Sequence, residues 1–172
     1  PIMIILLSLG VLFGIGGATL FSLRLGEGKK EEVRQALGNG FFLLFTAGLA
    51  FMILGQIFLK PLLVAFGASE TVLPFAEEYM RTIFFGAIFQ IVSLGFNHFI
   101  RADGFPRIAM YTMFLGAGTN IILDPIFIYG LNLGMRGAAL ATVLAQSLSF
   151  TWVMIHFFGK RANNKISFDV IK

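Results

Sequence analysis

Long uncharged, apolar runs alternate with short charged segments along this chain. Each run has about 20 residues, the length at which an α-helix crosses a hydrocarbon core of about 30 Å. The pattern predicts an all-α fold, a polytopic transmembrane helix bundle. Its five expected spans are residues 2–23, 38–59, 82–100, 108–129 and 137–158.

The segments between the runs are expected to lie at the membrane surfaces. Residues 24–36 carry Glu31 and Glu32 before Arg34, an order that favours a short interfacial helix. Residues 61–69 are apolar but too short to cross a bilayer, so we expect a bent interfacial connection there.

The composition supports the membrane assignment. Of the 172 residues, 57% are apolar and 13% are charged, whereas soluble domains have about 25% charged residues. The 21 Phe are spread along the whole sequence, which excludes a soluble domain with a single anchor. The basic residues behind the net charge of +4 are confined to segments between the runs, so no nucleic-acid partner is expected. The lack of cysteine excludes disulfides and thiolate metal sites.

The start of the chain lacks the features of a signal peptide. Pro1 already stands at an apolar run, with no basic n-region before it and no small-residue cleavage site after it. We therefore expect no signal peptide. We also expect the sequence to be a piece of a longer protein, in which a partner helix precedes the first span.

Lys and Arg are distributed unequally between alternate segments. One side of the expected membrane carries only three, namely Lys60, Arg81 and Arg136. The other side carries ten, namely Arg24, Lys29, Lys30, Arg34, Arg101, Arg107, Lys160, Arg161, Lys165 and Lys172. Because cytoplasmic segments are enriched in Lys and Arg, residues 24–36, 101–107 and 159–172 are expected in the cytoplasm.

Asp124 is the main candidate functional residue. It is the only charged residue between Arg107 and Arg136, and ionising a carboxylate in a bilayer without a partner costs about 2.5–3.5 kcal/mol on insertion scales. Asn120 lies one helical turn earlier, on the same face. Pro125 removes a backbone donor, which predicts a kink and an oxygen-rich patch around Asp124.

The following span presents a matching polar stripe. Thr142, Gln146 and Ser149 recur at i, i+4 and i+7, and Thr142 comes level with Asp124 if the two spans are antiparallel neighbours. Hard oxygen ligands suit a hard cation such as Na⁺. Alternatively, burial favours the protonated carboxyl, which would then bind and release H⁺. Both outcomes describe an ion-coupled transport site.

Further polar side chains lie within the third span and near the ends of the spans. Ser93 and Asn97 share a helix face, where they form an interhelical hydrogen bond or line a polar cavity, and the sequence leaves both open. His98 and His156 stand near span ends and are expected as interfacial side chains.

Enzyme functions fit poorly. An intramembrane aspartyl protease needs two opposed carboxylates, but only one lies within a span, because Asp103 belongs to a loop between arginines. Both histidines lie too near the span ends to serve a serine hydrolase. No Gly-rich phosphate loop with its lysine is present, so we expect neither an enzyme nor an organic cofactor.

Three stretches of the sequence resemble a known family. RADGFPRIAM, GTNIILDPIFIYGLNLGMRGAALATVLAQ and, upstream, GIGGATLFSLRLGEGKKEE are similar to the multidrug and toxic compound extrusion (MATE) transporters. The bacterial multidrug branch with the DinF-like and MepA-like exporters looks closest. The similarity covers essentially the whole chain and maps it onto the second to sixth helices of the N-terminal lobe.

The resemblance implies a function and a site. It implies a twelve-helix antiporter in the bacterial plasma membrane that exports small organic, often cationic drugs and is driven by Na⁺ or H⁺. Asn120, Asp124 and Thr142 match the family's cation-site positions, and Asn97 and Gln146 match positions that line its substrate cavity. The first helix, which supplies a second carboxylate in the family, and the whole C-terminal lobe have no counterpart in this sequence.

Two other functions remain open. A lipid-linked precursor flippase of the same superfamily would carry several basic residues in its central cavity, yet no Lys or Arg falls in the middle of a span. A non-transporting membrane scaffold would use Asp124 for stability alone, so that Asp124→Asn would leave function unchanged.

Overall fold

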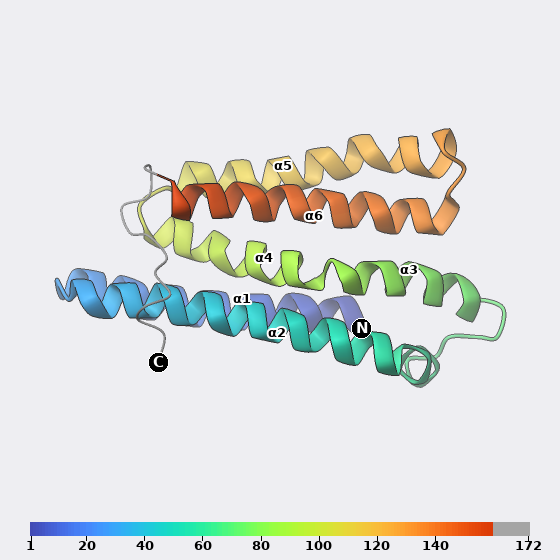
Figure 1. Cartoon of the computed structure of the whole chain (residues 1–172), viewed down its shortest axis with the longest axis horizontal. Helices are drawn as coiled ribbons and strands as arrows, with labels where there is room; N and C mark the ends of the chain where they lie inside the picture. The colour runs from blue at the N-terminus through green and yellow to red at the C-terminus, as the bar shows by residue number, and fades with distance from the viewer. Residues whose placement is uncertain (160–172) are drawn as a thin grey trace.

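The fold consists of helices, with no strand in the described part of the chain. The computed structural model describes residues 1–159, so the expected cytoplasmic tail beyond Gly159 lies outside the described residues. The elements are α1 (Ile2–Gly26), α2 (Lys30–Ala65), α3 (Leu73–Phe85), α4 (Ala87–Ala102), α5 (Pro106–Pro125), the π-helix η1 (Ile126–Gly130) and α6 (Gly134–Phe158) (Figure 1). The prediction of an all-α helix bundle is confirmed.

Most of the helices are long and apolar enough to span a membrane. Four stretches qualify alone, namely α1, α2, α5 with η1, and α6, and the bent pair α3 and α4 forms a fifth when taken as one broken span. The angle between α3 and α4 is 56°. The run expected as one span at 82–100 is therefore divided after Phe85, and α3 begins nine residues before that run, at Leu73.

The break between α3 and α4 lies at Gly86, which has φ −90° and ψ 0°. Glycine costs about 1 kcal/mol in a helix relative to alanine, so it favours a helix end. Here it also permits close packing, because a Cβ at Gly86 would lie 2.9 Å from Cγ2 of Val143 on α6. The carbonyl of Arg81 on α3 accepts a 2.7 Å hydrogen bond from Nε2 of Gln56 on α2.

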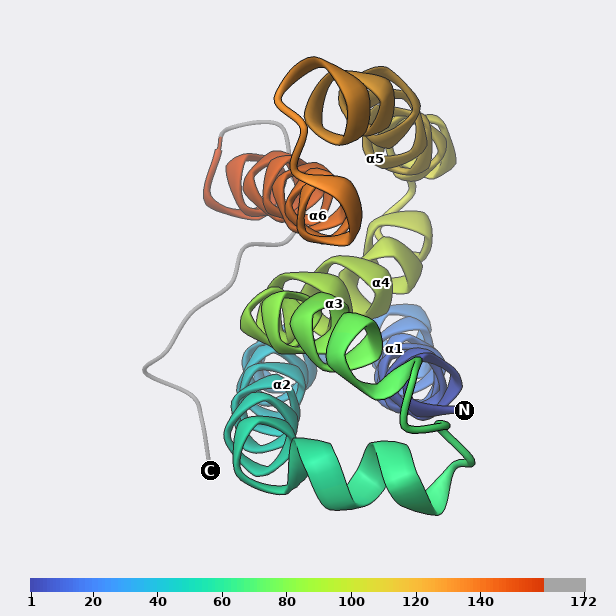
Figure 2. The ribbon, with the colours of Figure 1, turned by 90° about the vertical axis from the view of Figure 1, so that its right-hand side faces the viewer.

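A second bend lies near the end of α2. Phe58 has non-helical backbone angles, and Pro61 follows inside the helix without an N–H to donate. Beyond this bend the last turns of α2 run across the end of the bundle (Figure 2). They agree with the bent connection that the sequence predicts at 61–69.

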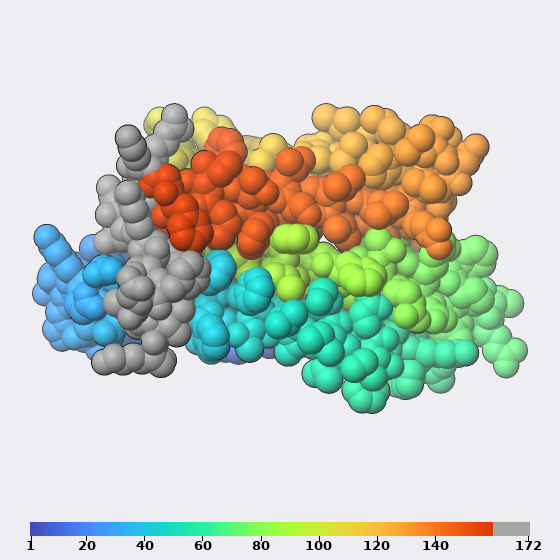
Figure 3. Space-filling model, in the orientation of Figure 1, coloured from blue at the N-terminus to red at the C-terminus, as the bar shows by residue number. Residues whose placement is uncertain are grey.

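α4 occupies the middle of the bundle. Figure 2 shows α1 and α2 on one side of α3–α4, and α5 and α6 on the other. α4 packs against all four of these helices, and among the described residues α1 and α2 have no close backbone contact with α5 or α6. On the face shown in Figure 3, α6, the α3–α4 layer and α2 lie side by side.

Aromatic side chains of α4 contact both α1 on one side of the bundle and α6 on the other. The rings of Phe96 and Phe99 are stacked with centroids 4.9 Å apart. Phe99 contacts Phe21 of α1 edge-on at 5.9 Å, and Phe96 contacts Phe157 of α6 at 5.2 Å. These four side chains are fully buried, so they form the centre of the hydrophobic core.

Glycines let the helices around α4 come close. A Cβ at Gly14 of α1 would lie 2.7 Å from Cα of Gly95 on α4. A Cβ at Gly17 or Gly40 would lie 2.6 Å from Cζ of Phe99. Small residues at helix interfaces are the usual means of close packing in membranes, where dispersion contacts replace the hydrophobic effect.

A buried polar pair connects the α4–α5 turn with the end of α6. Nε2 of His156 lies 3.8 Å from Oδ2 of Asp103, and both side chains are almost completely buried. The rings of Phe105 and Phe157 flank the imidazole edge-on at 5.0 Å. His156 is therefore not the interfacial side chain that its position near a span end suggested, whereas His98 is only half-buried.

Replacing His156 with leucine is expected to destabilise the protein by about 1–3 kcal/mol, because the Asp103 carboxylate then loses one of its polar neighbours in a buried site. Thermal unfolding of the detergent-solubilised full-length gene product measures this loss, with His98→Leu as the control on a half-buried histidine. Adding Asp103→Leu to the His156 variant is expected to restore part of the stability. An unchanged melting temperature for His156→Leu would show that the pair contributes nothing.

Candidate functional site

The candidate site lies where α5 and α6 run side by side as antiparallel neighbours (Figure 1). A tight turn joins η1 to α6, with Asn132 and Gly134 at positive φ. Within α5, Asp124 directly precedes Pro125, the last α-helical residue, and the chain continues as η1. Its π-type bond runs from N–H of Leu131 to the carbonyl of Ile126 at 2.9 Å.

The π-helix η1 begins directly after Pro125, the residue from which the sequence analysis expected a kink. Pro125 has no N–H for the carbonyl of Ile121, and the helix register widens directly afterwards. Wide turns of this kind occur frequently at functional sites of helices. The local backbone beside Asp124 is thus irregular in the region where the sequence placed the oxygen-rich patch.

A polar cavity of about 360 Å³ opens between α4, α5 and α6. Four of the five residues expected at the site line it, from three different helices: Asn97, Asn120, Thr142 and Gln146. Its other lining residues are Leu7, Gln90, Ser93, Leu94, Thr112, Met113, Gly116, Ala117, Ala145 and Ser149. No Lys, Arg, Asp or Glu lies among these residues, so the cavity wall is uncharged and combines polar with apolar side chains.

Asn120 and Thr142 are in direct contact across the two helices. Nδ2 of Asn120 donates a 3.2 Å hydrogen bond to Oγ1 of Thr142. The Thr142 hydroxyl donates in turn to the carbonyl of Ala138 at 3.0 Å. Because the asparagine contributes an N–H to this contact, its carbonyl oxygen is not consumed by it.

Asp124 lies one turn from Asn120 but is not among the residues that line the cavity. Asp124 is half-buried, and its Oδ1 atom is buried without a hydrogen-bond partner among the described residues. Such an atom costs roughly 1–3 kcal/mol, or more for a charged group. The structure therefore brings four expected residues together around one cavity, and places the fifth beside them with one oxygen unsatisfied.

Some cavity residues escaped the sequence analysis as site candidates. Oγ of Ser149 donates to the carbonyl of Thr112 at 3.3 Å, and both line the cavity. The sequence pattern did point to Ser149, which belongs to the polar stripe of the last span. It did not point to Thr112, because an isolated threonine is common in an apolar helix.

Asn97 fulfils both possibilities that the sequence left open. Its Nδ2 donates a 2.8 Å hydrogen bond to the carbonyl of Ala109 on α5, and it also lines the cavity. Its neighbour on the helix face, Ser93, is buried and lines the cavity too.

The chemistry of the donors limits what could bind here. Amide and hydroxyl oxygens with a nearby carboxylate suit a hard cation or a protonated amine, not a soft metal. The described residues contain no group of three or more His, Cys, Asp and Glu side chains placed to hold a metal ion. Apolar wall residues such as Leu94 and Met113 suit the apolar part of an amphiphilic compound.

Known proteins with similar sequences are multidrug exporters by name. Residues 1–126 match the MatE family model. The multidrug export protein MepA of Staphylococcus haemolyticus (strain JCSC1435) is 33% identical over 172 residues, covering 99% of this chain and 37% of that protein. MepA of Staphylococcus aureus (strain MRSA252) is 32% identical over 157 residues, covering 91% of this chain and 35% of that protein. The chain thus spans little more than a third of the length of these relatives.

Solved transporters share the fold. An inward-facing multidrug resistance MATE family transporter of the MOP superfamily has a TM-score of 0.92 at 29% identity, over 97% of this chain and 38% of that chain. An outward-facing one has a TM-score of 0.89 at 30% identity, over 99% of this chain and 38% of that chain. The resemblance noted from the sequence is confirmed, and this multi-pass membrane protein belongs to the MATE family.

Proposed function

We propose that the full-length gene product is a secondary active multidrug efflux transporter, an antiporter that exchanges Na⁺ or H⁺ for drugs across the bacterial plasma membrane. The MepA relatives support multidrug export by their names. The chain then forms part of the N-terminal lobe, and its substrates are small organic, often cationic compounds. Residues 24–36, 101–107 and 159–172 face the cytoplasm in this proposal.

One observation supports the proposed ion-coupling site. Asn120 and Thr142 meet across α5 and α6 at the polar cavity, and the unsatisfied Oδ1 of Asp124 lies one helical turn away. A cation at this place would receive oxygen ligands from Asp124, Asn120 and Thr142. A proton on Asp124 would satisfy the same oxygen, so the site suits either coupling ion.

The mechanism follows from competition for one negative charge. A cationic drug in the cavity next to Asn97 and Gln146 is attracted by ionised Asp124. Binding of Na⁺ or H⁺ at Asp124 neutralises that charge and weakens the hold on the drug. Because linked binding is reciprocal, the drug must weaken ion binding by the same factor.

The flippase alternative has less support from the cavity. No Lys or Arg lines it, whereas an anionic lipid-linked head group would need positive charge there. The scaffold alternative gives no reason for a buried carboxylate oxygen without a partner.

Saturating ethidium is expected to weaken ion binding by at least about fivefold, the lower end of usual coupling factors. Binding of ethidium to the purified full-length gene product is measured over a series of Na⁺ concentrations at fixed pH, and over a series of pH values without Na⁺. The ion that lowers the affinity for ethidium in its series is the coupling ion. Thr142→Ala is expected to weaken Na⁺ competition and leave H⁺ competition intact, since only Na⁺ needs the hydroxyl as a ligand. Ethidium affinities that change in neither series would contradict the proposed exchange.

A further inference from the structure

A second cavity lies between α1 and α2, away from the candidate site. It has a volume of about 860 Å³, which is within the usual range of about 300–1,000 Å³ for small-molecule sites. Its walls include the apolar side chains of Leu12, Leu20 and Leu43, and its floor contains Gly16 and Gly40. We call this cavity the α1–α2 slot.

Two glycines in the lining of the slot leave space because they lack side chains. Gly40 rests directly on the ring of Phe99, but a Cβ at Gly16 would meet no atom within 4 Å. The slot runs from Leu12 to Arg24, twelve residues along α1, which is about 18 Å at the helical rise. That length is close to half of a hydrocarbon core of about 30 Å, the depth of one membrane leaflet.

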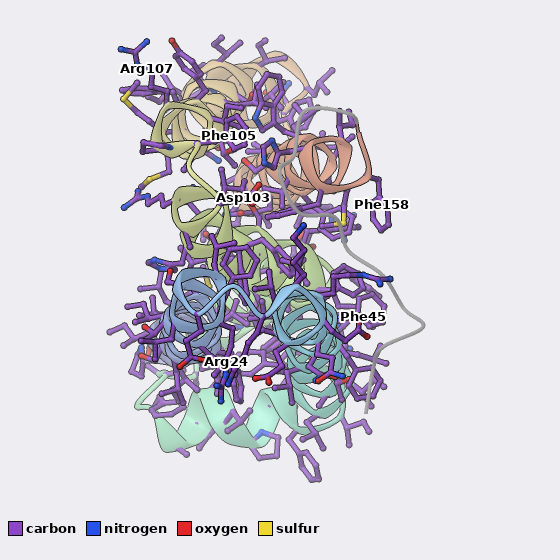
Figure 4. The ribbon with its side chains drawn as sticks, turned by 90° about the vertical axis from the view of Figure 1, so that its left-hand side faces the viewer. Arg24, Phe45, Asp103, Phe105, Arg107 and Phe158 are labelled. Carbon is purple, nitrogen blue, oxygen red and sulfur yellow. The ribbon has the colours of Figure 1, made fainter. Side chains whose placement is uncertain are left out.

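The end of the slot at the α1–α2 turn is polar and carries both signs of charge. Arg24 binds Glu32 through Nε at 2.8 Å and Glu27 through Nη1 at 2.8 Å. Nζ of Lys29 lies 3.0 Å from Glu27 and 3.7 Å from Glu32. Figure 4 shows Arg24 at the gap between the ends of α1 and α2, on the side away from α4.

The charge network favours the ionised form of the Glu27 carboxyl. Hydrogen bonds from Lys29 and Arg24 lower the pKa of the Glu27 carboxyl below its usual value. Two cations and two carboxylates then balance, so the network has no net charge. Its donors and acceptors lie at a helix end, in the segment proposed to face the cytoplasm.

We propose that the α1–α2 slot binds a zwitterionic aminophospholipid of the cytoplasmic leaflet. One acyl chain lies between Leu12, Leu20 and Leu43. The lipid phosphate accepts hydrogen bonds from Nη2 of Arg24, a nitrogen with no partner among the described residues. The lipid ammonium pairs with the Glu32 carboxylate.

Charge complementarity favours this lipid over an anionic one. Phosphatidylglycerol offers a phosphate but no cation, so it would add a negative charge beside Glu27 and Glu32 without pairing either carboxylate. Phosphatidylethanolamine offers both charges. The apolar part of the slot, at Leu12, Leu20 and Leu43, suits one acyl chain, and Gln35 and Asn39 add polar groups to the α2 wall.

The slot can be filled without disturbing the fold. Gly16→Leu places a side chain in open space and improves helix propensity, and Gly118→Leu on α5 is the matched control because its Cβ position is equally open. Native mass spectrometry of the full-length gene product, released from membranes of equal phosphatidylethanolamine and phosphatidylglycerol content, counts the retained lipids. Gly16→Leu is expected to retain phosphatidylethanolamine at least about fivefold less often, and Gly118→Leu as often as wild type.

The head group is tested separately at an exposed residue. Glu32→Gln is expected to remove the preference for phosphatidylethanolamine over phosphatidylglycerol, because the ammonium loses its partner while the acyl chain still lies in the slot.

Equal retention of phosphatidylethanolamine by wild type and Gly16→Leu would overturn the proposed lipid site. Equal loss of both lipids in Gly16→Leu, with no preference in wild type, would overturn the aminophospholipid. Absence of retained lipid in wild type, together with loss of folded protein in Gly16→Leu, would show that a protein segment fills the slot.

Discussion

Asp124→Asn is expected to abolish uphill drug export while leaving the protein folded and in the membrane. Asparagine has nearly the same shape as aspartate but carries neither a negative charge nor a titratable proton. Under the proposed exchange it can therefore pair with Na⁺ only weakly and cannot bind H⁺ at all. Drug then equilibrates across the membrane instead of being expelled against its gradient.

The measurement is ethidium efflux from drug-sensitive bacteria that express the full-length gene product. Glu31→Gln is the control, because Glu31 is an exposed carboxylate on α2 that pairs with Arg34, and its loss should leave export unchanged. Surface and total expression are compared for both variants. Normal export by Asp124→Asn would place coupling outside this site, and wild-type failure with every dye would favour the flippase or the scaffold.

Gly14→Leu is expected to prevent accumulation of folded protein. The first added carbon would lie 2.7 Å from Cα and 2.9 Å from the carbonyl oxygen of Gly95, which are backbone atoms that cannot turn aside. Inserting side-chain volume into a packed core typically costs about 1–3 kcal/mol, and here α1 and α4 themselves must separate, so we expect about 3 kcal/mol or more.

Fluorescence-detected size exclusion and thermal unfolding of detergent extracts measure this effect. Gly16→Leu is the matched comparison, since it makes the same substitution two residues further along α1 in open space. A folded yield of Gly14→Leu equal to that of Gly16→Leu would contradict the close packing of α1 on α4.

The spans and part of the site could be predicted because their signals are local. Uncharged runs of spanning length depend on composition alone, and a single aspartate in an apolar run stands out without any structure. The expectation that Thr142 lies near the helix face of Asn120 and Asp124 needed only the helical repeat and the antiparallel course of two consecutive spans. These features follow from residues close together in the sequence.

Other features depend on contacts between distant residues, which periodicity does not reveal. The break at Gly86 could not be distinguished from the many glycines that continue a membrane helix, because its cause lies in packing against Val143. Asp103 and His156 are 53 residues apart, and the sequence suggested a loop and an interface for them. The α1–α2 slot likewise combines residues of two helices and corresponds to no motif.

The central place of α4 has a consequence for biogenesis. During synthesis α1 and α2 emerge before α4 and can pair, but α4 carries Gln90, Ser93 and Asn97 into the membrane before α5 exists. Asn97 finds its acceptor, the carbonyl of Ala109, only after α5 has been translated, and until then its amide is exposed in a medium that offers no hydrogen bonds. We therefore expect α4 to remain beside the insertion machinery until α5 follows, so that the two helices enter the lipid together.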